Sequence, residues 1–420
     1  MRMSTRIIVR VKKMVRVLGP GLITGASDDD PSGIATYSQA GAKFGYATLW
    51  TALITFPLMA AVQGMCARIG IVTSQGLTVT LKNHYPKGIL YLMMLFSIPA
   101  IILNIGADIQ GMGAVAHMII PGIRTSVFCV IITAILMFII IKFPYQKIAS
   151  VLKWLCITLL LYILVPFFVN EDWPAIFYHT FIPTIKFNKE FFSILVAILG
   201  TTISPYLFFW QATMEAEDMA HSVKKVIVNK RILENMKMDV NFGMLLSNVV
   251  MFFIILTTGT VLFKAGITQI DTVDQAAEAL KPLAGNLTYL IFAVGVLGTG
   301  LLAIPVLAGS QSYMLAETFG WEEGLDKKFS EAKGFYITII ISLLVGVSLD
   351  FIGISPIHAL LYTAILYGIT SPVMIAIILH IGNNKKVMGE YTNSKLSNVL
   401  GIITLLLMTA AAVALIYLQF

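Results

Sequence analysis

The sequence predicts an all-α polytopic membrane protein with eleven transmembrane helices, arranged as an inverted repeat of five plus five helices with an eleventh helix appended. Three observations predict this fold. First, 57% of the 420 residues are hydrophobic and only 12% are charged, whereas soluble domains carry about 25% charged residues. Second, apolar runs long enough to span a bilayer recur along the whole chain. Third, two of these runs, the first and the sixth, are interrupted by proline.

Each predicted span is an apolar run of about 20 residues, the length that crosses the hydrocarbon core as a helix. The spans cover residues 17–42, 46–71, 88–113, 125–141, 146–169, 191–217, 239–263, 284–315, 335–351, 355–380 and 398–418. We divide the chain into a basic cytosolic tail (1–16), a first repeat (17–170), a second repeat (191–380) and an additional helix (398–418). The longest connections, 171–190, 218–238, 264–283 and 316–334, have room for short amphipathic helices but not for a soluble domain.

The basic residues set the expected orientation. With the N-terminus inside, about 22 of the 29 Lys and Arg residues fall in cytosolic segments, as the positive-inside rule requires. The odd number of spans then places the C-terminus outside, and the short loops favour a bacterial inner membrane. Because the net charge of +7 collects between apolar spans, it does not indicate nucleic-acid binding. The basic N-terminal residues lead into a helix with three aspartates, so we expect a retained first span instead of a cleaved signal peptide.

The first span is interrupted by Asp28-Asp29-Asp30-Pro31-Ser32-Gly33. A charge at the bilayer centre costs about 2.5–3.5 kcal/mol on insertion scales, and Asp-Pro-Ser-Gly favours a turn over a helix. A structural role alone does not account for three adjacent carboxylates at this depth. The pattern predicts a helix broken in mid-membrane, where free carbonyl groups and a carboxylate face a cavity and form a cation site.

The sixth span is interrupted in the same way, by Thr201-Thr202-Ile203-Ser204-Pro205-Tyr206. Since five spans separate the two breaks, the two broken helices enter the membrane in opposite directions, which is the pattern of an inverted repeat. The alternative is that each proline only kinks its helix, which is common in membranes. We expect carbonyl groups freed near Thr201 and Thr202 and the hydroxyl group of Ser204 to face the break in the first span.

Asp30 is the first choice for a metal ligand because it directly precedes the break. Asp28 and Asp29 either face the same vestibule and concentrate cations or cap the second half-helix. Asp108, an acidic residue within the third span, either lines the ion path or is a structural hydrogen-bonding residue. Carboxylate, carbonyl, hydroxyl and water oxygens form a hard ligand set that suits Mg²⁺, Ca²⁺ or Mn²⁺. The three cysteines, Cys66, Cys129 and Cys156, lie in apolar runs without metal-ligand spacing and are expected to be buried thiols.

Four stretches in the first two spans carry a resemblance to a known family. Leu18-Gly-Pro-Gly-Leu, Asp30-Pro31-Ser32-Gly33 with Ala35-Thr36, Phe44-Gly-Tyr46 with Leu49-Trp50, and Met65-Cys-Ala-Arg68-Ile-Gly70-Ile-Val-Thr73 resemble the first helices of the Nramp family of divalent-metal transporters. Pro205 adds to the match, which is weaker beyond the second span. The resemblance implies a LeuT-like fold of eleven helices, alternating access to a site between broken helices one and six, and a divalent metal as transported substrate, with no cofactor.

The sequence also departs from the family pattern. Gly33 occupies the position of the family's Asn in helix one, and Ser204 and Tyr206 replace the Met and His of its Met-Pro-His motif in helix six. Gly111 replaces a Glu in helix three, and Ala364 falls where helix ten has a Gln ligand; span nine lacks the family's basic residues. Loss of the thioether removes a soft ligand, and loss of the other side chains leaves room for water and removes titratable groups. These departures resemble the sequences of the Nramp-related magnesium transporter branch. The resemblance implies transport of a largely hydrated ion without proton coupling.

We therefore expect a secondary transporter that imports Mg²⁺, and also Mn²⁺, with a metal site at Asp30, Gly33, Thr201 and Ser204. The ion path is expected to include Asp28, Asp29, Asp108 and Tyr206. Two alternatives stay open: a proton-coupled Mn²⁺/Fe²⁺ importer, and an amino-acid or organic-cation symporter of the same fold. An enzyme is not expected, because the chain has no phosphate-binding loop, no His-Glu-x-x-His motif and no soluble domain. The expected partners are the divalent ions and the lipid bilayer, with no obligatory protein partner evident.

Overall fold

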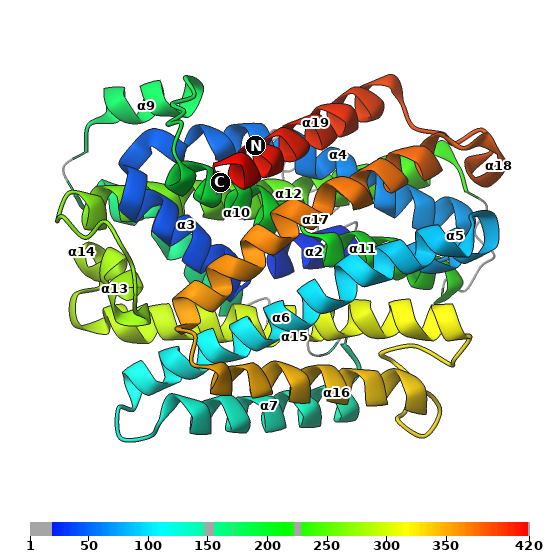
Figure 1. Cartoon of the computed structure of the whole chain (residues 1–420), viewed down its shortest axis with the longest axis horizontal. Helices are drawn as coiled ribbons and strands as arrows, with labels where there is room; N and C mark the ends of the chain where they lie inside the picture. The colour runs from blue at the N-terminus through cyan, green and yellow to red at the C-terminus, as the bar shows by residue number, and fades with distance from the viewer. Residues whose placement is uncertain (1–18, 146, 148–154, 170, 222–227, 419–420) are drawn as a thin grey trace, which may run out of the picture.

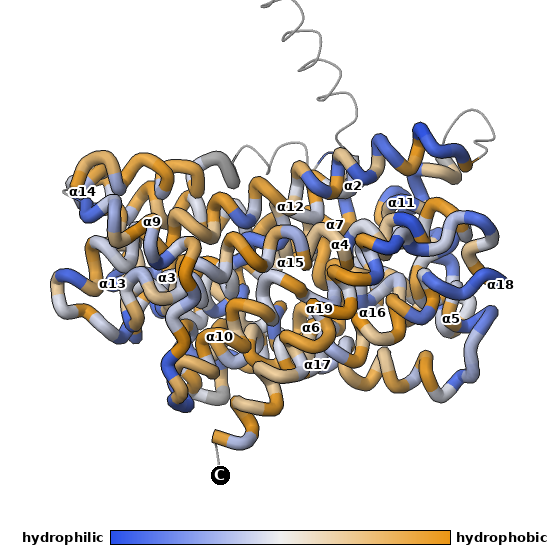
Figure 2. The backbone as a smooth tube through the Cα atoms, turned by 90° about the horizontal axis from the view of Figure 1, so that it is seen from above, coloured by the Kyte–Doolittle hydropathy of each residue, from blue (hydrophilic) through white to orange (hydrophobic). Residues whose placement is uncertain are grey.

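The computed structural model describes residues 19–145, 147, 155–169, 171–221 and 228–418, and within these ranges the chain is helical with no strand (Figure 1). Nine of the described helices are long and apolar enough to cross a membrane. The expected basic tail (1–16) and part of the fifth span lie outside the described residues. Blue, hydrophilic residues gather near α18 and α5 at one end in Figure 2, whereas orange segments run along the long helices.

The first span is broken at the residues the sequence singles out. Helix α2 (Pro20–Asp28) has Asp29 as its C-cap, and helix α3 (Pro31–Phe44) begins after Asp30, which is its N-cap. Proline suits the first position of a helix because its missing N–H has no partner there in any case. The sixth span divides in the same way into α10 (Lys189–Thr202) and α11 (Pro205–His221), separated by Ile203 and Ser204.

The other spans are formed by long helices close to the predicted ranges. They are α4 (Trp50–Thr73), α6 (Lys87–Ile119), α7 (Thr125–Lys142), α12 (Lys230–Thr258), α15 (Thr288–Phe319), α16 (Lys333–Ser348), α17 (Pro356–Asn383) and α19 (Lys395–Tyr417). A π-helical turn, Gly259–Phe263, extends α12. The described part of the fifth span is 3₁₀-helical, at Leu155–Ile163 and Val165–Phe167.

Short helices occupy most of the longer connections. They are α5 (Leu77–His84), α9 (Trp173–Phe181), α13 (Val273–Ala277), α14 (Lys281–Ala284) and α18 (Lys385–Met388). The connection after α15 contains no helix among its described residues. Single-turn 3₁₀ segments occur at Gly45–Thr48, Glu278–Leu280, Gly285–Leu287 and Leu349–Ile352.

Glycines allow the two broken helices to approach their neighbours closely. A methyl group added to Gly25 of α2 would overlap the backbone of Gly243 in α12, and one added to Gly200 of α10 would overlap the backbone of α17 at Gly368. Small residues serve this purpose in membrane interiors because helices there associate through close packing. Large apolar side chains such as Leu95, Phe138 and Leu406 are instead more than 60% exposed, which suits contact with lipid.

Helix α2 is also held by a side chain from α12. The carboxylate of Asp239 accepts hydrogen bonds from the backbone N–H groups of Gly19 (2.9 Å), Gly21 (2.7 Å) and Leu22 (3.3 Å). These groups belong to the first turn, where no partner exists within the helix. Asp239 therefore caps α2 from 217 or more residues away along the chain.

Candidate functional site

Asp30 lies at the centre of the break in the first span and is fully buried. Its Oδ1 accepts a hydrogen bond from the backbone N–H of Gly33 (2.7 Å), which fixes the carboxylate at the N-terminus of α3. Its Oδ2 accepts one from the side-chain amide of Asn104 in α6 (3.0 Å). Asp30, and neither Asp28 nor Asp29, is therefore the residue that caps the second half-helix. A negative charge is favourable at this position because the helix dipole is positive there.

Asp108 shares a hydrogen-bonding neighbour with Asp30. The amide of Asn104 also faces Asp108 Oδ2, at 3.4 Å, so that one side chain bridges the two carboxylates. Asn104 and Asp108 are one turn apart on α6 and both are fully buried. Asn104 was not among the predicted site residues, although its position four residues before an intramembrane aspartate placed both on one helix face.

Asp28 and Asp29 face a different helix. The hydroxyl group of Ser247 in α12 lies 2.7 Å from Asp28 Oδ2 and 3.2 Å from Asp29 Oδ1. The three adjacent aspartates thus divide between two neighbours: Asp30 contacts α6, whereas Asp28 and Asp29 contact α12. Ser247 was missed from the sequence because a lone serine in an apolar helix gives no signal of a polar partner 218 or 219 residues away.

The break in the sixth span lies next to the break in the first. The side-chain oxygen of Thr201 is 3.4 Å from the position that a Cβ atom would take at Gly33, and the carbonyl oxygen of Asp28 is 3.2 Å from the same point. Ser204 donates its hydroxyl hydrogen to a backbone carbonyl group at the end of α10, that of Gly200 (3.0 Å) or Thr201 (2.6 Å). Its oxygen keeps lone pairs that a cation or water can use.

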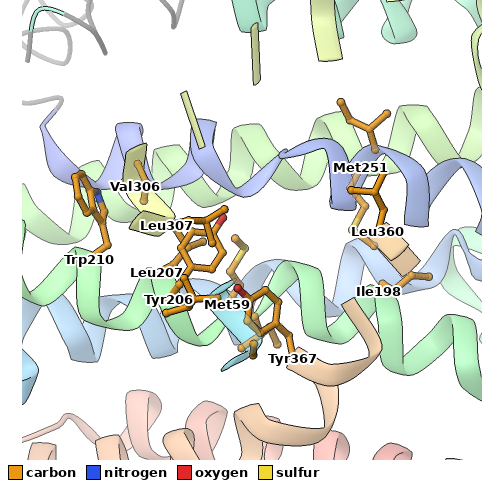
Figure 3. Close-up of a cluster of buried hydrophobic side chains, with 14 of the residues drawn as sticks. Met59, Ile198, Tyr206, Leu207, Trp210, Met251, Val306, Leu307, Leu360 and Tyr367 are labelled. Carbon is orange, nitrogen blue, oxygen red and sulfur yellow. The ribbon is translucent and has the colours of Figure 1, made fainter. Parts of the chain in front are cut away.

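Tyr206 connects the two breaks directly. Its hydroxyl group donates a hydrogen bond to the carbonyl oxygen of Ser27 (2.9 Å). Its ring lies 5.9 Å from that of Tyr367 in α17, centre to centre, and Figure 3 shows both rings among buried side chains that include Met59 and Leu207. Tyr206 therefore fixes the position of the end of α2 relative to α11.

Several buried oxygen atoms around these residues have no hydrogen-bond partner among the described residues. They are Asp28 Oδ1, Asn104 Oδ1, Asp108 Oδ1, Ser27 Oγ and the hydroxyl oxygen of Tyr367. Buried polar atoms are normally paired, so each exception requires a physical explanation. The first three are acceptors without a donor. Such a group suits a cation or the water molecules that a cation retains, because both supply the missing positive partner.

No group of three or more His, Cys, Asp or Glu side chains with metal-binding geometry occurs in the part of the chain that the structure describes. A metal held at this break would therefore depend mainly on the Asp30 carboxylate, together with carbonyl, hydroxyl and water oxygens. Cys66 and Cys129 are buried free thiols on other parts of the fold, as expected for residues that pack in the interior, and Cys156 lies where no side chain is described.

Comparison with protein families gives one match that covers nearly the whole chain. The model for the Nramp family, described as natural resistance-associated macrophage protein-like, matches residues 21–418. The chain belongs to the Nramp family. The expectation from the first two spans is therefore confirmed, and it extends to the later spans where the motifs are weak.

Curated relatives and solved structures agree with this assignment. A divalent metal cation transporter MntH of Caldanaerobacter subterraneus is 24% identical over 403 residues, which cover 94% of this Nramp chain and 91% of the relative. The MntH of Bacillus subtilis is also 24% identical, over 95% of the chain and 91% of the relative. A crystal structure of an Eremococcus coleocola manganese transporter has a TM-score of 0.76 at 16% identity, covering 97% of this chain and 87% of its own.

A more distant structure shows how general the fold is. Mhp1, a nucleobase-cation-symport-1 family transporter, matches with a TM-score of 0.58 at 13% identity over 95% of this chain and 93% of its own. At this identity the likeness concerns the fold alone. It confirms the predicted LeuT-like arrangement for this Nramp chain.

The structure also places the positions at which this Nramp chain departs from the family pattern. Gly33 lies at the centre of the site, where the atoms closest to a hypothetical Cβ belong to Asp28, Thr201 and Tyr37. Ala364 is fully buried where α17 crosses α10, with its carbonyl oxygen against Gly200. Glycine has no side chain and alanine has only a methyl group, so neither position supplies a polar side-chain ligand.

Proposed function

We propose that this protein imports Mg²⁺, and also Mn²⁺, by alternating access at a site between the two broken helices, without coupling to protons. As a member of the Nramp family it is a divalent-metal transporter, not an enzyme, and the metal is its substrate and not a cofactor. The choice of metal and the absence of proton coupling are our proposal. Asp30, Gly33, Thr201 and Ser204 form the proposed metal site.

The observation that carries the proposal is the group of unpartnered acceptor oxygens around Asp30. Asp28 Oδ1, Asn104 Oδ1 and Asp108 Oδ1 are buried and lack donors among the described residues. Mg²⁺ gives up its water reluctantly and is usually held through one or two carboxylates with several waters retained. Those waters are hydrogen-bond donors. A partly hydrated ion bound to Asp30 would therefore supply the donors that these oxygens lack.

The ligand types support the same choice of ion. Thioether and thiolate ligands favour soft metals, whereas carboxylate, carbonyl and water oxygens favour Mg²⁺, Ca²⁺ and Mn²⁺. Ser204 stands at the break of helix six where the family pattern has a methionine, so the thioether is missing there. Transfer of a double charge down the membrane potential gains about 4.6 kcal/mol per 100 mV, which supports uptake without a proton gradient.

Metal uptake into proteoliposomes tests the proposal. Wild-type protein should take up Mg²⁺, with Mn²⁺ competing and with no acidification of the liposome interior. Asp30→Ala should abolish uptake. Asp30→Asn should abolish it as well, although Asn keeps an oxygen that can cap Gly33 and so preserves the fold. Normal Mg²⁺ uptake by folded Asp30→Asn protein would refute the site, and metal-dependent acidification would refute the uncoupled mechanism.

A second candidate, proton-coupled Mn²⁺ or Fe²⁺ import, is favoured by the names of the relatives. The curated relatives are divalent metal cation transporters, and the Eremococcus coleocola structure is that of a manganese transporter. The two candidates differ in their response to Cd²⁺, because a site without soft ligands should bind it weakly. Strong inhibition by Cd²⁺, together with acidification during Mn²⁺ uptake, would favour the second candidate.

The proposal includes an arrangement in the membrane. We infer that residues 17–170 and 191–380 act as the two inverted repeats and residues 398–418 as an additional helix, in a bacterial inner membrane with the N-terminus in the cytosol. The distribution of Lys and Arg supports this orientation. The bilayer and the transported ions are the only partners that the proposal requires.

A further inference from the structure

A groove on the side of the molecule lies between α4, α12 and α19, away from the two breaks. It has a volume of about 240 Å³ and has an apolar part and a polar part. The apolar part is lined mainly by Phe56, Pro57, Ala60, Ala61, Gly64 and Leu400. The polar part is lined by Arg68, Lys237, Asn241 and Ser397, with Met236 and Leu396 beside them. The two parts thus separate along the helices, with the charges at one end.

Neither cation of the groove forms an ion pair with a carboxylate among the described residues. Arg68 of α4 is half-buried, and its guanidinium donates a hydrogen bond to the side-chain oxygen of Asn393 (3.3 Å), which is neutral. The ion pairs found among the described residues involve Lys43, Lys264 and Lys327, and neither Arg68 nor Lys237. Lys237 is exposed near the start of α12. Both cations are therefore accessible to an anion that approaches this end of the groove.

The beginning of α19 adds to the positive potential at this end. Ser394 caps the helix by accepting a hydrogen bond from the N–H of Ser397 (3.1 Å), and Lys395 is the first helical residue. The N-terminus of a helix of this length carries a partial positive charge that attracts phosphate groups. Ser397, which lines the groove, lies within this first turn.

Three small residues, Ala60, Ala61 and Gly64, keep the apolar part of the groove open. A Cβ atom added to Gly64 would have no neighbour within 4 Å, which is unusual among the glycines of the long helices. Phe56 and Arg68 are twelve residues apart on α4, a distance of about 18 Å along the helix. An apolar trough of this length that ends at two cations matches the two parts of a phospholipid, the acyl chain and the phosphate.

We propose that this groove binds an anionic phospholipid of the surrounding leaflet, with its phosphate between Arg68 and Lys237 and an acyl chain along Gly64. Basic pockets between transmembrane helices are known sites for anionic headgroups. The lipid would contact α12, which also carries Asp239 and Ser247, the residues that hold α2 and the first break. The proposal does not depend on which metal is transported.

Native mass spectrometry of the purified, detergent-solubilised protein tests this proposal. Phosphatidylglycerol is the probe, and phosphatidylethanolamine and inorganic phosphate are the comparisons. We expect wild-type protein to retain one phosphatidylglycerol at least tenfold more tightly than phosphatidylethanolamine. The double variant Arg68→Gln/Lys237→Gln should lose this preference. Gly64→Leu should weaken retention while leaving both charges in place, because its side chain fills the trough. Lys142→Gln, an exposed cation at the end of α7, is the matched control and should bind like wild type.

Three results would overturn the proposal. The first is that wild type and the double variant retain phosphatidylglycerol equally. The second is that wild type retains the two phospholipids equally. The third is that inorganic phosphate alone occupies the site. Size-exclusion profiles establish that each variant is folded. If Arg68→Gln disrupts folding, Lys237→Gln and Gly64→Leu still test the headgroup and chain positions separately.

Discussion

Asp239 holds the first half-helix by its backbone, and removing that carboxylate should release α2. Asp239→Ala leaves three N–H groups, those of Gly19, Gly21 and Leu22, without their acceptor. Hydrogen bonds to charged groups contribute about 1.5–3 kcal/mol each when buried, but Gly19 is only half-buried, so water can replace part of the loss. The upper value for the loss of a helix cap is about 2 kcal/mol. A change of this size in free energy should raise the population of released α2 about 30-fold.

Cysteine accessibility measures this release. A cysteine replaces Ser27, which is fully buried on α2, in a background without native cysteines. Its reaction rate with a water-soluble maleimide should rise by up to about 30-fold when Asp239→Ala is added, and less with Asp239→Asn, which keeps one acceptor oxygen. Glu234→Ala, an exposed carboxylate on the same helix, is the control. An unchanged rate in Asp239→Ala, or an equal rise in the control, would refute the reasoning.

Three further outcomes are expected. Gly200→Ala should lower the unfolding temperature in detergent, because the added methyl group overlaps the backbone of α17 and overpacking costs about 1–3 kcal/mol. Gly64→Ala is the control and should leave the unfolding temperature unchanged, because no atom lies within 4 Å of the added methyl group. Burial and three neighbouring glutamates, Glu317, Glu217 and Glu322, raise the pKa of Glu323, in the connection after α15, from 4.5 to about 8. The folded state therefore binds the extra proton, stability should fall as pH rises from 5 to 8, and Glu323→Gln should flatten that fall in melting curves. Tyr206→Phe leaves the carbonyl of Ser27 without its donor, and metal uptake should slow about five-fold for a loss of about 1 kcal/mol; wild-type uptake would show that this bond is not needed.

Much of the fold follows from local chemistry, and for that reason it can be predicted. The break at Asp30 and Pro31 is found at the predicted residues because an N-cap aspartate and an N1 proline define a helix start without help from the rest of the chain. The break before Pro205 has the same local cause. Long apolar runs define the remaining spans, with most ends displaced by a few residues, as at Thr288–Phe319 against the predicted 284–315. The start of α12 differs more, at Lys230 against the predicted 239.

The direction in which each aspartate points could not be predicted. Asp28 and Asp29 contact Ser247, whereas Asp30 contacts Asn104, and these neighbours come from helices far away in the sequence. Only the packing of α2 against α12, through glycine contacts, and of α3 near α6 determines the choice. The 3₁₀ form of residues 155–163 was missed as well, since an apolar run does not distinguish one helix type from another.

Ser247 has one hydroxyl hydrogen and two carboxylates within reach. At any instant it can donate to Asp28 or to Asp29 but not fully to both. Rotation of a hydroxyl group takes far less time than movement of a helix. The serine can therefore exchange partners while every helix stays in place, and α12 can respond to a change of charge at the break before any part of the backbone moves.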